Sequence, residues 1–197
     1  MALLNPFAKP GSPLLDAKVA TLRYPQSTDY EAWARLRDIS RDHLQPWEPT
    51  WGPDELSKTA YRRRMTRYSQ DIRDDRGYAF WIILPDGRLA GGCTLTNVRR
   101  GVAQAASLGY WTGAPFAGKG LMTAAVQAVL GHCFTALNFH RVEAACLPSN
   151  AASKRVLEKC GFREEGYAVK YLKIDGTWHD HLLFAILEDD WRAAQKG

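Results

Sequence analysis

The segment from Ala117 to Met122 places two glycines and a lysine directly before an apolar helix pattern. Gly118 and Gly120 permit backbone conformations in which N–H groups approach a ligand closely. A helix start supplies unpaired N–H groups and the positive end of a dipole, and Lys119 adds a positive charge. This combination predicts a phosphate-binding loop, and a plain glycine turn before a core helix is the alternative interpretation.

Two familiar phosphate loops are excluded by single residues. A P-loop requires Ser or Thr directly after the lysine, where this chain has Gly120. A dinucleotide-binding fingerprint requires a third glycine, where this chain has Thr123. The predicted ligand is therefore a different diphosphate.

Neither the cysteines nor the histidines have the spacing of a metal site. The cysteines form no CxxC and lie far apart, which argues against a thiolate zinc site or a disulfide framework and suits a reducing cytoplasm: Cys93, Cys133, Cys146 and Cys160. His179 and His181 alternate on one face of a predicted strand, and no third ligand is evident. We expect that strand to face the surface and no metal to be bound.

Hydrophobic patterns and turn residues predict the elements that position the loop. Strands are predicted at 19–24, 78–84, 89–98, 105–111 and 141–147, and two more on either side of Asp175-Gly176. Helices are predicted after a Thr28 and Glu31 capping box, over 54–68, from Leu121, and from an Asn150 cap to Gly161. This order predicts an α/β fold with a mixed sheet and helices on both faces.

Length and composition favour one globular domain. The chain has 197 residues, of which 46% are hydrophobic, and no linker composition interrupts 20–190. We expect a loose N-terminal leader over 1–15 and a single domain over 16–197. The net charge of +5 suits anionic ligands or nucleic acid. The uncharged stretch 120–139 holds too many polar residues to span a membrane, so no membrane association is expected.

Several blocks of the chain resemble the GNAT acyltransferase superfamily. GYWTGAPFAGKGLMTAAV at 109–126 is similar to its acetyl-CoA motif, and HRVEAACLPSNAASKRVLEKCGF at 140–162 to the strand and helix that follow. HLQPWEP at 43–49 and EEGYAVKYLKIDGTWHDHLLFA at 164–185 resemble the RimJ/RimL branch, which acetylates N-terminal residues of ribosomal proteins. Together these blocks cover most of 20–191.

The resemblance implies a GNAT fold, whose mostly antiparallel sheet splays between the strands at 105–111 and 141–147. Acetyl-CoA would lie in that gap as cosubstrate. Its contacts would come from the loop and from three residues of the neighbouring strand and helix: Ala117, Gly118, Lys119, Gly120, Leu121 and Met122, together with Trp111, Asn150 and Ser153. Two positions depart from the superfamily signature, because Ala117 replaces a polar residue and Met122 replaces a small one.

The resemblance also implies catalytic roles. The superfamily often has a tyrosine that protonates the leaving thiolate, but this chain has Leu157 there. Ser153 lies one turn nearer the helix start on the face of Asn150, so its hydroxyl is the predicted substitute. A backbone N–H near Tyr110 is expected to stabilise the oxyanion. Glu165 is the predicted base, with an ordinary solvated carboxylate as the alternative interpretation.

Because acetyl-CoA is already an activated thioester, an amine can attack it without a covalent enzyme intermediate. The expected function is transfer of acetyl to the N-terminal α-amine of a protein, and of a ribosomal protein in particular. Trp47 and Glu48 would receive that N-terminus. Four arginines lie on one predicted helix: Arg62, Arg63, Arg64 and Arg67. They would contact ribosomal RNA or an acidic segment of the substrate, and a solvated helix face is the alternative interpretation. The alternatives are a GNAT enzyme for a small amine such as an antibiotic or polyamine, and a non-catalytic basic binding protein of the same fold.

Overall fold

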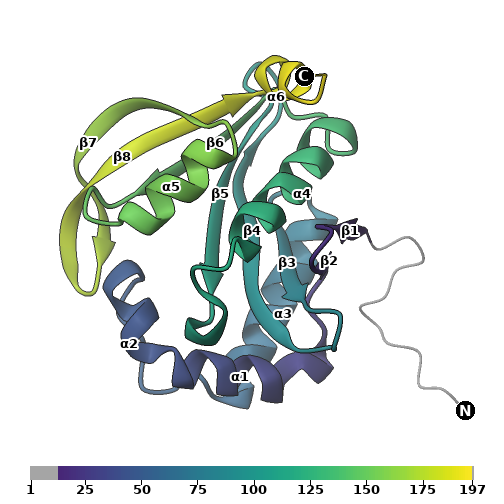
Figure 1. Ribbon diagram of the computed structural model, residues 1–197. Coiled ribbons are helices and arrows are strands. Elements are labelled where there is room, and N and C mark those ends of the chain that lie inside the picture. The colour runs from purple at the N-terminus through teal and green to yellow at the C-terminus, as the bar shows by residue number, and fades with distance from the viewer. Residues whose placement is uncertain (1–12, 197) are drawn as a thin grey trace, which may run out of the picture.

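The structure of the chain is a computed structural model that describes residues 13–196 (Figure 1). Its strands are β1 (Leu14–Asp16), β2 (Thr21–Arg23), β3 (Tyr78–Ile83), β4 (Leu89–Arg99), β5 (Ala105–Thr112), β6 (Arg141–Cys146), β7 (Arg163–Ile174) and β8 (Thr177–Leu187). Its α-helices are α1 (Tyr30–Ile39), α2 (Arg41–Leu44), α3 (Lys58–Arg73), α4 (Leu121–Thr135), α5 (Ala151–Lys159) and α6 (Glu188–Ala194). Short 3₁₀ turns are η1 (Ser27–Asp29), η2 (Gln45–Trp47) and η3 (Ala114–Phe116).

The strands form one mixed sheet in the order β1-β2-β3-β4-β5-β6-β8-β7. All of its neighbouring pairs are antiparallel except β5 and β6, which run parallel. The predicted α/β class and the mostly antiparallel sheet expected from the resemblance are thereby confirmed. None of the helices in the described part of the chain has the length and apolar character needed to cross a membrane.

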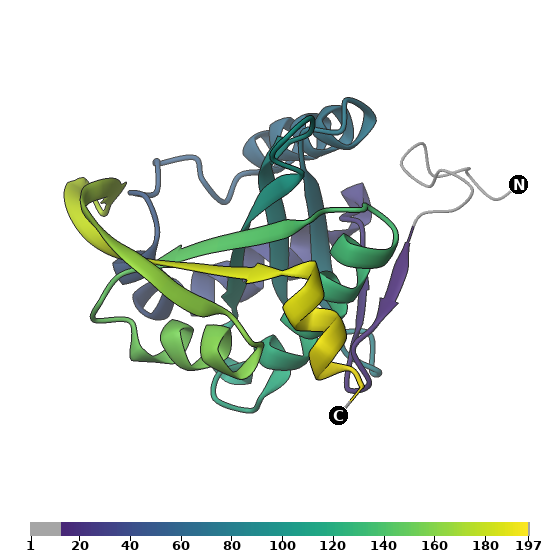
Figure 2. The same cartoon turned by 90° about the horizontal axis from the view of Figure 1, so that it is seen from above.

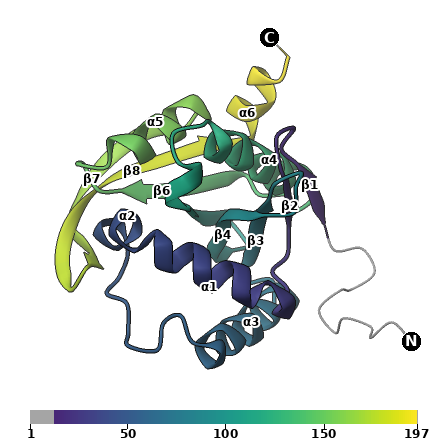
Figure 3. The same ribbon diagram turned by 60° about the horizontal axis from the view of Figure 1, so that its bottom comes forward.

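Helices cover both faces of the sheet (Figure 3). Helix α4 presents buried side chains at every fourth position, Leu121, Ala125, Val129 and Cys133, to the larger core between α4, α5 and the sheet. Helices α1 and α3 bury Trp33 and Tyr61 against Trp81 on the other face, in a separate core. The central strands β3, β4 and β5 therefore lie between the two cores.

The sheet splits where β5 and β6 stop pairing. These strands pair only over Ala105–Ser107 and Arg141–Glu143. Beyond that point β5 continues beside β4, and β6 continues beside β8. The view from above shows the two halves of the sheet diverging (Figure 2). The splay expected from the resemblance is therefore present, at the predicted pair of strands.

Three local predictions need correction. The capping box before α1 is formed by Gln26 and Asp29, whose carboxylate accepts from the Gln26 N–H at 2.7 Å and also forms a bidentate ion pair with Arg23. The helix expected from position 54 begins only at Lys58, after Ser57 accepts the capping hydrogen bond from Ala60. Most of the expected leader lies outside the described residues, but its last two positions, 14 and 15, belong to β1 rather than to a loose segment.

Candidate functional site

The predicted phosphate loop forms a pocket of about 220 Å³ before α4, here called the loop pocket. Gly118 and Gly120 have φ values of +74° and +76°, the left-handed region that favours glycine. A methyl group added at either glycine would meet no heavy atom within 4 Å, so the space above both is open. No side chain caps α4. Its first N–H groups are therefore available to an anion.

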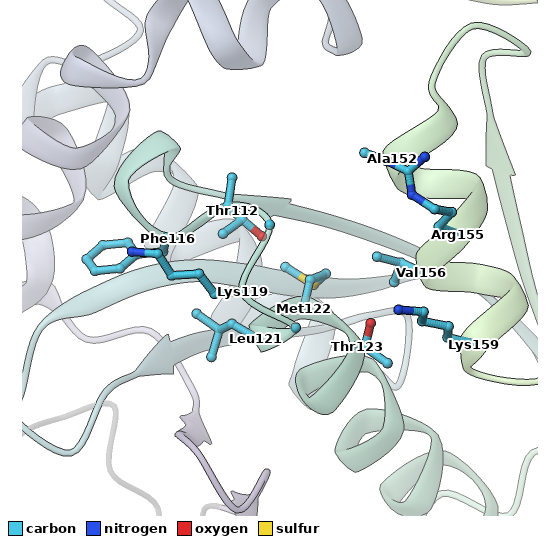
Figure 4. Close-up of a pocket in the computed structure, with 13 residues that line it drawn as sticks. Thr112, Phe116, Lys119, Leu121, Met122, Thr123, Ala152, Arg155, Val156 and Lys159 are labelled. Carbon is cyan, nitrogen blue, oxygen red and sulfur yellow. The ribbon is translucent and has the colours of Figure 1, made fainter.

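Two cations on α5 face this loop from the other side of the pocket (Figure 4). Arg155 and Lys159 are four residues apart and lie on one face of α5. Lys119, the cation predicted from the sequence, instead donates to the backbone oxygen of Pro115 at 2.9 Å. The positive charge of the pocket thus comes mainly from α5. The i, i+4 spacing of Arg155 and Lys159 was the available sequence signal.

The loop pocket adjoins a cavity of about 320 Å³ between β5 and β6, here called the central cavity. Both share Gly118, Met122 and Val156 as lining residues. The central cavity collects most of the predicted site residues: Trp47, Glu48, Tyr110, Trp111, Ala117, Gly118, Met122, Asn150 and Ser153. The remaining loop residues Lys119, Gly120 and Leu121 line the loop pocket. A long ligand can therefore run from the helix start into the splay.

Two hydroxyl groups meet inside the central cavity. The Tyr110 hydroxyl lies 2.8 Å from Ser153 Oγ. The Asn150 side chain caps α5 by accepting from the Ser153 N–H at 3.0 Å, which fixes Ser153 in the first turn. Burial raises the pKa of the Tyr110 hydroxyl above its ordinary value, so it keeps its proton at neutral pH. The pair can act as a hydrogen-bond donor in the cavity.

The backbone of Tyr110 also faces this cavity. The Gly113 N–H donates to Ala90 O at 2.9 Å, one step beyond the paired residues Gly91 and Thr112. Hydrogen-bonded and non-hydrogen-bonded pairs alternate along an antiparallel ladder, and Tyr110 lies an odd number of residues, three, before Gly113. The N–H of Tyr110 therefore points away from β4. β6 has already left β5 at that level. The N–H at Tyr110 is thus directed into the splay, where the sequence predicted an oxyanion donor.

Glu48 lies at the wall of the central cavity with its carboxylate already engaged. It accepts from both terminal nitrogens of Arg37, at 3.1 and 2.5 Å, and from the indole N–H of Trp51 at 2.8 Å. Its backbone oxygen accepts from the Asp175 N–H at the tip of the β7–β8 hairpin. Trp47 is 37% exposed beside it. The predicted substrate loop is therefore at the cavity, held by Arg37 and the hairpin.

Glu165 is not part of this group. Its carboxylate forms two hydrogen bonds with Arg141, at the end of β6 that still pairs with β5 and so away from the splay. The Arg141 guanidinium lowers the pKa of Glu165, which makes it a weaker proton acceptor. We therefore do not assign Glu165 as the base. The bulges of the long strand β7 and its pairing with β8 place the Glu165 side chain beside Arg141. The sequence around Glu165 predicts neither the bulges nor the pairing.

His181 also departs from expectation. It was predicted on a surface-facing strand, but it is buried and lines the central cavity. β8 lies between β6 and β7, and the Tyr171 ring packs edge-on against His181 with centroids 5.9 Å apart. No group of three or more potential metal-ligating side chains occurs within residues 13–196.

The arginines of α3 are partly neutralised. Arg63 pairs with Asp54 and Arg64 pairs with Glu55, and the guanidinium of Arg67 lies over the ring of Tyr68. Arg62 is exposed. A contact between this helix and RNA stays a prediction.

Comparison with known proteins agrees with this geometry. Residues 20–163 match the family described as acetyltransferase (GNAT) domain. The chain is 38% identical to a probable N-acetyltransferase, YjcK, of Bacillus subtilis, over 90% of this chain and 98% of that protein. It is 35% identical to the [ribosomal protein uS5]-alanine N-acetyltransferase of Escherichia coli, over 83% and 86%. A structure of Mycobacterium smegmatis RimJ in complex with CoA-disulfide superimposes with a TM-score of 0.83 and 38% identity, over 93% and 94%. The chain therefore belongs to the GNAT acetyltransferase family, among relatives that include ribosomal-protein alanine N-acetyltransferases.

Proposed function

We propose that this enzyme transfers the acetyl group of acetyl-CoA to the N-terminal α-amine of a protein, and of a ribosomal protein in particular. One observation carries the proposal: two adjoining pockets with shared walls extend from an uncapped helix start flanked by Arg155 and Lys159 to the Tyr110–Ser153 pair. The names of two relatives support it, since one is a uS5-alanine N-acetyltransferase and one is a RimJ solved with a CoA-disulfide.

The loop pocket fits a pyrophosphate. Gly118 and Gly120 leave open space at the N–H groups of α4, and Arg155 and Lys159 supply positive charge opposite. The pantetheine arm then extends past Met122 and Val156, which line both cavities. This path brings the thioester to Tyr110 and Ser153.

The residues at the thioester match the needs of a direct amine attack. The N–H of Tyr110 stabilises the oxyanion of the tetrahedral intermediate. When the C–S bond breaks, the Ser153 hydroxyl donates a hydrogen bond to the developing thiolate, and Tyr110 supports it through its own hydroxyl. The proton lost by the amine passes to water, and the released thiolate takes its proton from water. Ser153, supported by the Tyr110 hydroxyl, takes the place of the tyrosine that is absent at Leu157.

No cysteine is suited to form an acyl-enzyme. Burial raises the pKa of Cys146, which lines the central cavity, and raises that of Cys160 to about 12. Thiols in this state are protonated at neutral pH and are poor nucleophiles. All four cysteines are buried and free, and we place the protein in a reducing cytoplasm on that ground.

The attacking α-amine needs little help from the enzyme to lose its proton before it attacks. An α-amine with a pKa near 8 is roughly a tenth neutral at pH 7. Glu48 is the carboxylate of the central cavity and lies at the entry for the N-terminus. A water chain past Glu48 accounts for the remaining proton transfer.

The basic residues around the loop pocket should contribute unequally to the affinity for CoA. Arg155→Ala is expected to raise the dissociation constant for CoA by about 3- to 10-fold at low salt, because an exposed cation at a phosphate is screened but not cancelled. Lys119→Ala should raise it by less than about twofold, because its ammonium is bound to Pro115. Titration calorimetry at low and high salt measures both. A larger loss for Lys119→Ala would contradict the ranking.

Glu165→Gln should leave catalysis almost unchanged. The carboxylate is half-exposed, pairs with Arg141 and lines none of the cavities described above. We expect a pH–rate profile parallel to that of the unaltered enzyme and a loss of unfolding free energy below about 1 kcal/mol. A selective loss of kcat at low pH would restore Glu165 as the base.

Turnover with a panel of acceptors tests the proposed function. The enzyme is incubated with acetyl-CoA and alanine-first or serine-first peptides, spermidine and an aminoglycoside, and CoA release is followed. We expect turnover with the peptides. Turnover only with the small amines would refute the proposal, and the absence of any CoA binding would refute an enzymatic role.

A further inference from the structure

His181 is a buried titratable side chain to which the proposed function assigns no role. It is 2% exposed, and it lines the central cavity together with Tyr110 and Ser153. On β8 it comes directly before Leu182, which pairs with Cys146 at the last position of β6. β5 no longer pairs with β6 at that level, so the imidazole lies at the open end of the splay. It therefore borders the space in which we place the thioester.

The surroundings of His181 fix its neutral tautomer. Nδ1 lies 3.0 Å from the backbone oxygen of His179, and a carbonyl oxygen can only accept a hydrogen bond. Nδ1 therefore carries the proton, and the lone pair of the neutral ring is on Nε2. The Tyr171 ring packs edge-on against the imidazole from β7, whereas the Asp180 carboxylate accepts from the Tyr167 hydroxyl instead. Within residues 13–196 no group forms a hydrogen bond with Nε2, which leaves it free to accept from a water in the cavity.

The other titratable side chains of the central cavity are poor proton acceptors or are exposed. In the described part of the chain they are His43, Glu48, Tyr110 and Cys146. The Glu48 carboxylate already accepts three hydrogen bonds. Burial raises the pKa of the Tyr110 hydroxyl and of the Cys146 thiol, so both keep their protons at neutral pH. His43 on α2 is exposed, which leaves His181 as the buried acceptor with a free lone pair in this group.

Resting on the proposed function, we infer that Nε2 of His181 takes the first proton of the acceptor's N-terminal ammonium group through one water in the central cavity. The neutral amine then attacks the acetyl carbon and the C–S bond breaks. The second proton of the nitrogen passes through water to the CoA thiolate, and the imidazolium returns its proton to bulk water before the next turnover. His181 thereby lets the enzyme use an acceptor that arrives protonated.

Replacement of His181 by asparagine tests the inference through the pH dependence of catalysis. His181→Asn removes Nε2 but keeps a side-chain amide that can donate to the His179 oxygen. With an alanine-first peptide, we expect kcat/KM to fall about tenfold at pH 7 and less than about twofold at pH 9. The reason is that an α-amine with a pKa near 8 is roughly a tenth neutral at pH 7 and mostly neutral at pH 9, where it needs no base. The dissociation constant for CoA should stay nearly unchanged.

Two further histidines provide the controls. His179→Asn is the matched substitution two residues away, because it keeps the backbone oxygen that fixes His181 and its side chain lines neither the loop pocket nor the central cavity. Its kcat/KM should stay at the value of the unaltered enzyme at both pH values. His43→Asn tests the exposed alternative, and we expect its effect to be the same at pH 7 and pH 9. A loss confined to pH 7 in His43→Asn, without one in His181→Asn, would overturn the inference.

The dependence on pH separates a lost proton acceptor from structural damage, which would lower kcat/KM equally at both pH values. Losses of equal size, or no loss at pH 7, in a folded His181→Asn variant would overturn the inference and leave the proposed function intact. If thermal unfolding shows that His181→Asn does not fold, His181→Gln is measured with the same expectation, since its amide is not a base. A lack of turnover by the unaltered enzyme with every peptide would instead count against the proposed function itself.

Discussion

Ser153→Ala is expected to lower kcat by about 10²-fold while the dissociation constant for acetyl-CoA stays nearly unchanged. The hydroxyl bonds the sulfur most strongly when thiolate charge develops, so its loss affects the transition state more than the bound substrate. Tyr110→Phe should lower kcat in the same way, because the two hydroxyls lie 2.8 Å apart and act together. Steady-state kinetics and CoA titration on each variant measure the two effects.

The double variant distinguishes a working pair from two separate contributions. If the hydroxyls form one donor unit, Ser153→Ala combined with Tyr110→Phe should cost little more than either change alone. Ser107→Ala is a suitable control. Ser107 lies on β5, the strand of Tyr110, but its hydroxyl contacts Asn97 at 3.4 Å, outside the cavities. Unchanged kcat in Ser153→Ala would remove the proposed thiolate donor.

Gly120→Val is expected to raise the dissociation constant for CoA by about tenfold or more, a change of about 1.4 kcal/mol or more. The structure leaves open space at Gly120, so the side chain would occupy the volume where we place the pyrophosphate. The φ of +76° adds backbone strain of roughly 1–2 kcal/mol for a side-chain-bearing residue. Calorimetric titration with CoA measures affinity, and thermal unfolding measures the strain.

Gly101→Val separates these two effects. Gly101 has a φ of +62° and equally open surroundings, but it lies in the turn between β4 and β5 and lines none of the cavities described here. Both variants should lose similar stability, and only Gly120→Val should lose affinity for CoA. Equal affinities in the two variants would place the pyrophosphate elsewhere.

The parts of the site that the sequence predicted are those fixed by neighbouring residues. Gly118 and Gly120 require positive φ, and Asn150 caps a helix through Ser153, within a few residues in each case. Such turn and cap chemistry is encoded locally. The glycine loop and the Asn150–Ser153 turn were therefore predictable, whereas the splay between the strands that flank them was expected only from the resemblance to the GNAT superfamily.

The parts that were missed or wrong depend on distant pairings. Glu165 was taken out of the site by Arg141, 24 residues earlier, and the Tyr110 hydroxyl meets Ser153 across 43 residues. Burial of His181 results from β8 lying inside the sheet rather than at its edge. A single sequence shows how polar and apolar residues alternate along a strand, but it does not show which strands lie beside it in the sheet. The register of β7, β8 and β6 thus decided which side chains reach the cavity.

The most direct test of the central claim is to locate the transferred acetyl group. An alanine-first peptide with one internal lysine is incubated with the enzyme and acetyl-CoA, and the product is fragmented in a mass spectrometer. We predict one acetyl group per peptide, carried on the N-terminal α-amine, and no reaction when that amine is blocked beforehand. Acetyl found on the lysine side chain, or acetylation that persists in the blocked peptide, would contradict the account.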